Sequence, residues 1–306
     1  MFRVQSIVFA LGALCTSYAN AIGPDESAAP ALDTAAIEAA TGLKGTYNKA
    51  ENVFKVTKPR DDVKLNVDRW QLPPFMGITS WAAFTPMPKG AMVMGDTVLF
   101  EDEVNPAMSA ALDAGLEVTA LHNHFFFDQP RVYFMHIAGM GDATKLARGV
   151  RALYDRIAQV RAGQAAPGAS FAGDIPSPSS ITAAPLEEVL GAKAQSKDGM
   201  AKVSLGRSVK MHNTTMGNEM GVNTWAAFAG GDDRAVVDGD FAMTEDELQP
   251  VLKAMRGAGI NIVAIHQHMT HETPRLVFLH YWGKGKAIDL AKGLKSALQA
   301  QQAVKG

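Results

Sequence analysis

The sequence predicts an α+β fold made of two similar domains, with mostly antiparallel sheets and flanking helices. When the 306-residue chain is shifted by 144 residues it matches itself, and 28 of the 69 positions from 81 to 149 are identical to their counterparts. Each copy contains short segments of alternating apolar residues, typical of strands, followed by helical patterns. A repeat of this length is a domain-sized unit, so we expect the halves to pack as a pseudo-dimer within a monomer.

Four segments follow from this duplication. We expect a signal peptide over residues 1–21, a first repeat domain over 22–160, a linker over 161–185 and a second repeat domain over 186–306. The linker is rich in Ala, Gly, Ser and Pro, a composition typical of connecting segments.

The N-terminus has the pattern of a secretory signal peptide. A positively charged start precedes an apolar stretch over residues 7–14, and small residues at 19–21 predict cleavage after Ala21. A lipid anchor at Cys15 is disfavoured because Leu14 stands where a lipobox has a small residue. Cleavage removes the chain's one cysteine and thereby excludes thiolate catalysis. We therefore expect a periplasmic or secreted protein.

The charge balance excludes other classes of partner. The chain has 29 Lys and Arg against 31 Asp and Glu, a formal net charge of -2, so no basic surface for nucleic acid is predicted. No apolar run is long enough for a membrane span once the signal peptide is removed.

The elements of the first copy can be placed in order. We expect a helix at 33–40, strands at 53–56, 63–67, 80–84 and 91–100, a helix near 102, strands at 117–126 and 131–138, and a last helix from 142. The pair Gly95-Asp96 predicts a two-residue hairpin turn. Asp102 and Asp246 are the predicted N-caps of equivalent helices. Asn105 and Gln249 lie three residues later, in capping-box positions.

Histidines mark the candidate site. Seven of the eight lie in two windows of fifteen residues, 122–136 and 266–280. Two histidines separated by one residue point to the same face of a strand. If residues 127–131 form a hairpin loop, residues whose numbers sum to 258 pair, which places the third histidine opposite the first. Each window therefore predicts three converging imidazoles: His122, His124 and His136 in the first copy, and His266, His268 and His280 in the second.

The pattern of identities supports one specialised face. In the strands of this hairpin, identities between the copies fall on even-numbered residues, whereas odd positions exchange one apolar or amide residue for another. A core face tolerates such exchanges. The retained face is therefore expected to carry the more specific chemistry.

Charged residues near the histidines are further candidates. Asp128 and Glu272 follow the histidine pairs by four residues and are predicted as an additional ligand or a ring-orienting group. His271 gives the second copy an extra ligand or base. Arg131 and Arg275 at the hairpin loops could bind an anionic substrate, or pair with the neighbouring carboxylate to fix the loop.

Zinc is the favoured metal because it binds imidazole and carboxylate without thiolate, and copper is second because Met135 and Met269 lie nearby. The second copy is predicted to bind metal more tightly, because it has His271 and Glu272 where the first has Phe127 and an aspartate. Two alternatives stay open: metal-free acid–base or hydrogen-bonding histidines, and histidines with a purely structural role.

A family resemblance rests on several motifs taken together. The segments TSWAAF, AMVMGD, FEDEVNPAM and EVTALHNHFFFDQPRVYFMHIAGMGDATKLARG, with their second copies, resemble the LppY/LpqO family of bacterial envelope proteins. The resemblance covers essentially the whole mature chain and implies export and duplication. Its named members look like lipoproteins, and this chain departs from them because it lacks a proper lipobox. The family has no settled activity, so no catalytic residues are implied.

Two functional hypotheses follow. The first is an exported envelope protein whose duplicated three-histidine sites bind a divalent metal and could activate water to hydrolyse an envelope substrate. The alternative is a non-catalytic module that binds a cell-wall or small anionic ligand, using the two arginines, Trp81 and Trp225, with the histidines as hydrogen-bond donors. Whether the protein is an enzyme stays open.

Overall fold

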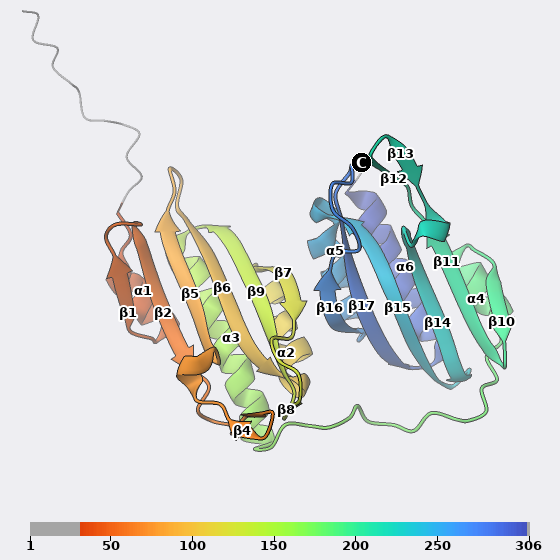
Figure 1. Ribbon diagram of the computed structural model, residues 1–306, viewed down its shortest axis with the longest axis horizontal. Helices are drawn as coiled ribbons and strands as arrows, with labels where there is room; N and C mark the ends of the chain where they lie inside the picture. Colours follow the sequence, from red (N-terminus) through yellow and green to blue (C-terminus); the bar gives the residue numbers. More distant parts are fainter. Residues whose placement is uncertain (1–30, 305–306) are drawn as a thin grey trace, which may run out of the picture.

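The computed structural model describes residues 31–304 and has the predicted α+β fold, built twice (Figure 1). The first half contains α1 (Thr34–Thr41), β1 (Gly45–Asn48), β2 (Val53–Pro59), β3 (Asn66–Val67), β4 (Trp70–Gln71), η1 (Pro74–Met76), β5 (Thr79–Pro86), β6 (Ala91–Phe100), α2 (Glu101–Asp113), β7 (Glu117–His122), β8 (Asp128–Gln129), β9 (Val132–Gly141) and α3 (Ala143–Gly163). The predicted signal peptide and Cys15 lie outside the described residues.

The second half repeats this order without a counterpart of β8. It contains α4 (Ala183–Leu190), β10 (Ala194–Lys197), β11 (Met200–Gly206), β12 (Val209–Met211), β13 (Thr214–Met216), η2 (Asn218–Met220), β14 (Asn223–Gly231), β15 (Arg234–Thr244), α5 (Glu245–Gly257), β16 (Asn261–His266), β17 (Leu276–Gly285) and α6 (Ala287–Ala303). No helix among residues 31–304 is long and apolar enough to cross a membrane.

The main strands form one sheet that runs through both halves. Its order is β1-β2-β5-β6-β9-β7-β16-β17-β15-β14-β11-β10, twelve strands with every neighbouring pair antiparallel (Figure 1). At its centre β7 pairs with β16 at Leu121 and Ile265, which are equivalent positions 144 residues apart. The two halves therefore meet edge to edge around a local twofold relation.

Reciprocal side-chain amides cross this junction. The Asn105 amide accepts from the backbone N–H of Ile262 at 2.7 Å and donates to its carbonyl at 3.1 Å. Gln249, the equivalent of Asn105, makes the same two bonds with Val118 at 3.0 and 2.9 Å. Each half thus satisfies backbone groups on the bulged inner strand of the other, as in a pseudo-dimer.

The helices cover only one face of the sheet (Figure 1). Between sheet and helices, one continuous apolar core includes side chains from both halves. The opposite face, called the open face below, has two smaller apolar clusters, one in each half. Elsewhere it exposes side chains, among them Met94 (54%) and Met140 (70%). The core therefore holds the halves together and leaves one side of the sheet available to ligands.

The predicted turn at Gly95-Asp96 is wrong, because both residues lie inside the continuous strand β6. A glycine is needed there for packing rather than for turning. At the equivalent Gly239, a Cβ would come within 2.1 Å of the Tyr281 hydroxyl and 2.3 Å of the Trp225 carbonyl oxygen.

The predicted hairpin register is wrong by two residues. Ala120 pairs with His136 and Phe134 pairs with His122, so paired numbers sum to 256. Strand β7 ends at His122, and the connection contains β8, which pairs with β3. Because side chains alternate with period two, a shift of two residues leaves the same side chains on the same face.

The predicted N-caps are also wrong. Helices α2 and α5 begin earlier, with Phe100 and Thr244 as N-caps rather than Asp102 and Asp246. Glu103 closes the capping box by accepting the backbone N–H of Phe100 at 2.9 Å. The two amides predicted for that role are those that cross to the opposite half.

Candidate metal centre

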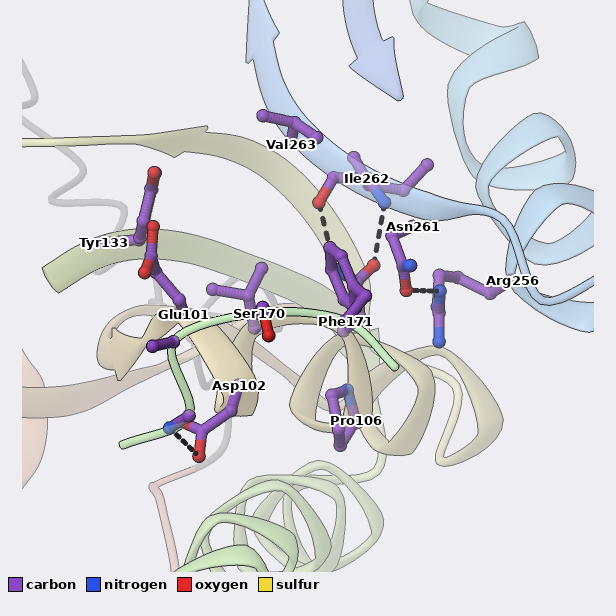
Figure 2. Close-up of a pocket in the computed structure, with 14 residues that line it drawn as sticks. Glu101, Asp102, Pro106, Tyr133, Ser170, Phe171, Arg256, Asn261, Ile262 and Val263 are labelled. Carbon is purple, nitrogen blue, oxygen red and sulfur yellow. Dashed lines mark hydrogen bonds between the residues drawn. The ribbon is translucent and has the colours of Figure 1, made fainter. Parts of the chain in front are cut away.

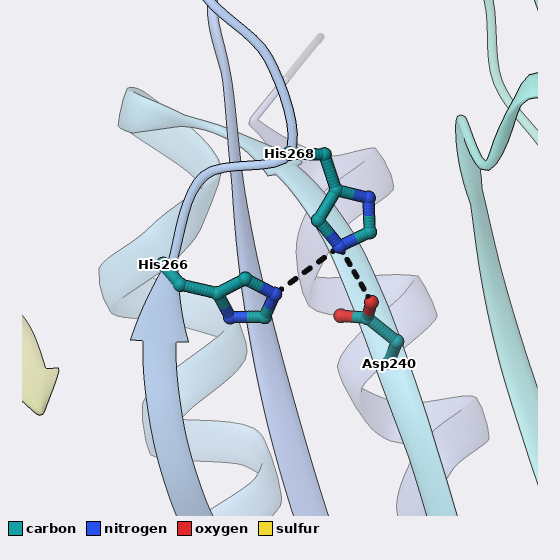
Figure 3. Close-up of side chains that lie close together, drawn as sticks. All are labelled: Asp240, His266 and His268. Atoms are coloured by element: carbon teal, nitrogen blue, oxygen red, sulfur yellow. Dashed lines mark hydrogen bonds and ion pairs between the residues drawn. The ribbon is translucent and has the colours of Figure 1, made fainter.

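Three ligand groups meet on the open face of the second half (Figure 3). A carboxylate oxygen of Asp240 lies 2.9 Å from Nε2 of His268, which lies 3.1 Å from Nε2 of His266. One ligand atom from each residue lies within 4.8 Å of the others. Adjacent ligand atoms around a tetrahedral zinc ion are separated by about 3.3–3.6 Å. A small outward movement of these side chains would therefore admit an ion.

Neighbouring strands position this group. Asp240 lies within β15, directly opposite His280 on β17, and His266 is the last residue of β16. The ring centroid of His280 lies 4.5 Å from that of His266. His268 follows the end of the strand, and its ring stacks on Phe278 at 3.6 Å, which holds the loop imidazole over the sheet. All three predicted histidines of the second copy thus lie together.

Burial prepares these groups to bind a cation. Asp240 is 3% exposed, and neither its Oδ1 nor the Nδ1 of His266 has a hydrogen-bond partner among the described residues. Burial raises the pKa of Asp240, while His280 and His268 oppose that rise. Burial, assisted by His280 and His268, lowers the pKa of His266 to about 4. His266 is therefore neutral near pH 7, which is the form that coordinates metal.

The predicted histidines of the first half also lie near an aspartate, Asp96, but they form a less compact group than those of the second half. Nε2 of His136 lies 3.0 Å from Nε2 of His122, and the ring of His124 lies 5.1 Å from that of His122. His124 stacks on Phe134 at 3.4 Å. Burial, followed by the charge of His122, lowers the pKa of His124. Asp96 pairs with His136 across β6 and β9. Within residues 31–304, only the second half brings three ligand atoms within 4.8 Å.

The two acidic residues that the sequence predicts as additional ligands lie in the connections that lead into β9 and β17. Asp128 accepts the backbone N–H of Val132 at 2.8 Å, and Glu272 accepts that of Leu276 at 3.1 Å. These contacts fix the entry of β9 and β17. His271 is exposed, and its ring lies 6.4 Å from that of His212, outside the three-residue group.

The two predicted anion-binding arginines are exposed. Nε of Arg275 lies 3.6 Å from a carboxylate oxygen of Glu245, and both side chains are more than half exposed. Arg131 lies beside the Tyr133 hydroxyl and lowers the pKa of that phenol, which burial raises more strongly. Their role toward an anion stays a prediction.

Asp240 and its equivalent Asp96 are not among the residues that the sequence predicts for the site. The sequence contains a sign of their role, because both copies have a Gly-Asp pair whose aspartate has an even number, like the converging histidines. The Gly-Asp pair predicts a turn, and a turn places the carboxylate away from the histidines. Inside a strand, the same aspartate lies opposite His280 and on the retained face.

A separate cavity of about 420 Å³ lies where the halves meet (Figure 2). Ser170 and Phe171 of the linker run along it, and Ile262 presents the backbone groups that bind across the junction (Figure 2). Arg256 lines the cavity and binds the side chain of Asn261 at 2.9 Å. Burial lowers the pKa of Arg256 to about 10. This cavity contains none of the predicted histidines.

Fold and site together define a duplicated α+β protein with one open sheet face and a group of side chains able to bind a metal. The chain belongs to the family described as Domain of Unknown Function (DUF1259), whose profile matches residues 35–156 and 184–300. The two matched segments agree with the duplication, and the LppY/LpqO name stays a prediction. No curated protein matches the chain.

One solved structure, that of a trimeric bacterial microcompartment shell protein PduB, is similar at 10% sequence identity. The match covers 85% of this chain and 91% of that chain, with a TM-score of 0.22.

Proposed function

We propose that this protein is exported and binds a divalent metal ion in its second half, with Asp240, His266 and His268 as its three protein ligands and His280 beside them. The observation that carries the proposal is the convergence of the carboxylate and the two Nε2 atoms at 2.9 and 3.1 Å. The partnerless Oδ1 of Asp240 supports it, because a buried carboxylate oxygen requires a cation or a donor.

Zinc is the metal we favour, since two imidazoles and a carboxylate form a ligand set that zinc commonly accepts. Copper stays second. Met135 gives it no support, because this side chain is fully buried in the core on the helix-covered face. Met269 packs against the smaller apolar cluster of the second half.

Hydrolysis of an envelope substrate is the activity we propose for the loaded site. The ligand group lies on the open face, and the side chain of His268 is 30% exposed, so water can reach it. A zinc ion with three protein ligands and one open position lowers the pKa of bound water to near neutrality. The alternative of non-catalytic binding of an anionic ligand has less support, because the Arg275 guanidinium faces Glu245.

Elemental analysis of purified mature protein tests this proposal. We expect about one zinc ion per chain, and loss of that ion in the double variant His266→Ala, His268→Ala. His212→Asn is the matched control, because His212 is a histidine of the same half that lies outside the group. Asparagine tolerates the positive φ of 47° at that position. Metal-free protein whose melting temperature is unchanged by added zinc would contradict the proposal.

The difference between the halves provides a second test. We expect His268→Ala to reduce zinc affinity more than His124→Ala, because His268 contacts Asp240 within the compact group of three ligand residues. The two equivalent changes can be compared by titration with zinc in one buffer. Equal losses, or a larger loss from His124→Ala, would show that the second half is not the tighter site.

A further inference from the structure

An aromatic cleft lies on the open face beside the candidate metal site formed by Asp240, His266 and His268. Its volume is about 560 Å³. It is lined by Phe171, Trp225, Asp238, Val263, His280 and Trp282. His280 belongs to both regions, since its ring also lies 4.5 Å from that of His266. A molecule bound in the cleft would therefore lie next to the three metal-binding residues, Asp240, His266 and His268.

The strand register explains why these side chains share one surface. Trp225 pairs with Asp240 across β14 and β15, and Asp238 pairs with Trp282 across β15 and β17. Asp238 and Asp240 are two residues apart and therefore point to the same face. Two indole rings and an exposed carboxylate thus follow adjacent rows of the open face.

The linker supplies the remaining aromatic wall. The Lys284 ammonium donates to the backbone carbonyls of Phe171 and Gly173 at 3.1 and 2.8 Å. These bonds hold the linker against the end of β17. The Phe171 side chain remains 47% exposed while it lines the cleft.

The chemistry of the walls selects the kind of ligand. The half-buried indole rings that line the cleft favour a ligand with a flat apolar face, and the carboxylate of Asp238 accepts hydrogen bonds from hydroxyl or amide donors. The Lys202 ammonium lies 4.1 Å from the centre of the Trp225 ring. That ammonium repels an organic cation, which is the other kind of ligand that aromatic cages recognise.

The first half keeps part of this framework but not the second indole or the carboxylate. Lys55 lies 4.3 Å over the ring of Trp81, as Lys202 does over Trp225. The equivalents of Asp238 and Trp282 are Met94 and Ala138. The second indole and the carboxylate are therefore features of the half that has the compact ligand group.

We propose that this cleft binds a carbohydrate, with a pyranose ring stacked on Trp282 and Trp225 and its hydroxyl groups donating to Asp238. Binding requires no metal. One consequence rests on the proposed function. If the site holds a metal, a bound sugar lies beside that metal and belongs to the class of substrate that the metal site would hydrolyse. A hydroxyl-rich neutral ring satisfies the aromatic faces, the carboxylate and the ammonium together.

Titration calorimetry of the full chain with chitotriose and with maltotriose, in buffer containing EDTA, tests this proposal. We expect at least one trisaccharide to bind with a dissociation constant of about 1 mM or tighter. Trp282→Ala is expected to weaken binding at least about tenfold. Asp238→Asn, a change of an exposed side chain with little effect on folding, is expected to weaken it several-fold. Trp81→Ala is the matched control and should leave the affinity unchanged.

The opposite results would overturn the proposal. These are no heat with either trisaccharide, binding of tetramethylammonium in their place, or equal losses from Trp81→Ala and Trp282→Ala. Because EDTA removes metal, the outcome is separable from the proposed function. Sugar binding by protein that takes up no zinc would refute the metal centre alone, and zinc binding without sugar binding would refute the cleft alone.

Discussion

The reciprocal amides at the junction of the halves should contribute unequally to stability. Asn105→Ala removes two hydrogen bonds of 2.7 and 3.1 Å to the backbone of Ile262. Gln249→Ala removes the two equivalent bonds to Val118. Asn105 is 6% exposed, whereas Gln249 is only half-buried. We therefore expect Asn105→Ala to destabilise the protein more than Gln249→Ala.

The magnitude follows from the backbone groups that lose their partners. Leaving a buried donor or acceptor unsatisfied costs about 1–3 kcal/mol. Asn105→Ala leaves the backbone N–H and C=O of Ile262 without partners at a buried position. We therefore expect a loss of about 2–4 kcal/mol in the free energy of unfolding. Water can partly replace the Gln249 amide at its more open position, which reduces the expected loss to about 1–2 kcal/mol.

Urea unfolding followed by tryptophan fluorescence and by far-ultraviolet circular dichroism measures both losses. Gln195→Ala, a change of an exposed amide on β10, is the control and should change stability by less than about 0.5 kcal/mol. In the double variant Asn105→Ala, Gln249→Ala, the two signals are expected to separate, because the halves then unfold with less coupling. A loss from Asn105→Ala no larger than that of the control, or a larger loss from Gln249→Ala, would refute the reasoning.

Three further predictions concern single residues. Glu103 is fully buried and accepts two bonds from Arg60 at 2.7 and 2.9 Å, so Glu103→Gln should lower the free energy of unfolding by about 3–5 kcal/mol in urea titrations. The pKa of His266 is about 4 in the fold and about 6.5 in the unfolded chain. The unfolded chain therefore binds more protons between these values, and metal-free protein should lose about 1–2 kcal/mol as the pH falls from 7 to 4, allowing for screening at a part-exposed site. His266→Gln should reduce the change of melting temperature with pH. If the variant and the unchanged protein have the same pH dependence, groups other than His266 cause it. Gly239→Ala would place a Cβ 2.1 Å from the Tyr281 hydroxyl and 2.3 Å from the Trp225 carbonyl oxygen, and it should cost about 1–3 kcal/mol, measured by thermal unfolding. A neutral effect would mean that both the tyrosine and the Trp225 backbone move freely.

Sequence reasoning predicted the duplicated α+β fold and the face that carries the histidines. Both predictions rest on patterns that can be seen directly in the sequence. One is the internal repeat at a shift of 144 residues, and the other is the alternation of side chains along strands. The register error did not disturb the second result, because a shift of two residues preserves the face. His122 and His136 therefore still meet, with their Nε2 atoms 3.0 Å apart.

Other features depend on contacts that sequence spacing does not encode. The Asn105 amide binds a strand that lies 157 residues away in the sequence, while its spacing from Asp102 mimicked a capping box. Asp240 belongs to the ligand group only because its strand lies next to β17. At both places a local sequence pattern predicts local structure, whereas contacts between distant segments determine the observed structure.

The covalent connection between the halves has a consequence for how the two sites could diverge in evolution. In a symmetric dimer of identical chains, every substitution appears at both sites at once. Here each half has its own residues, so Trp282 and Asp238 can occupy one surface while Ala138 and Met94 occupy the other. The junction keeps its twofold amides, whereas the open face is free to differ. One half can therefore acquire a new ligand while the other retains an ancestral role.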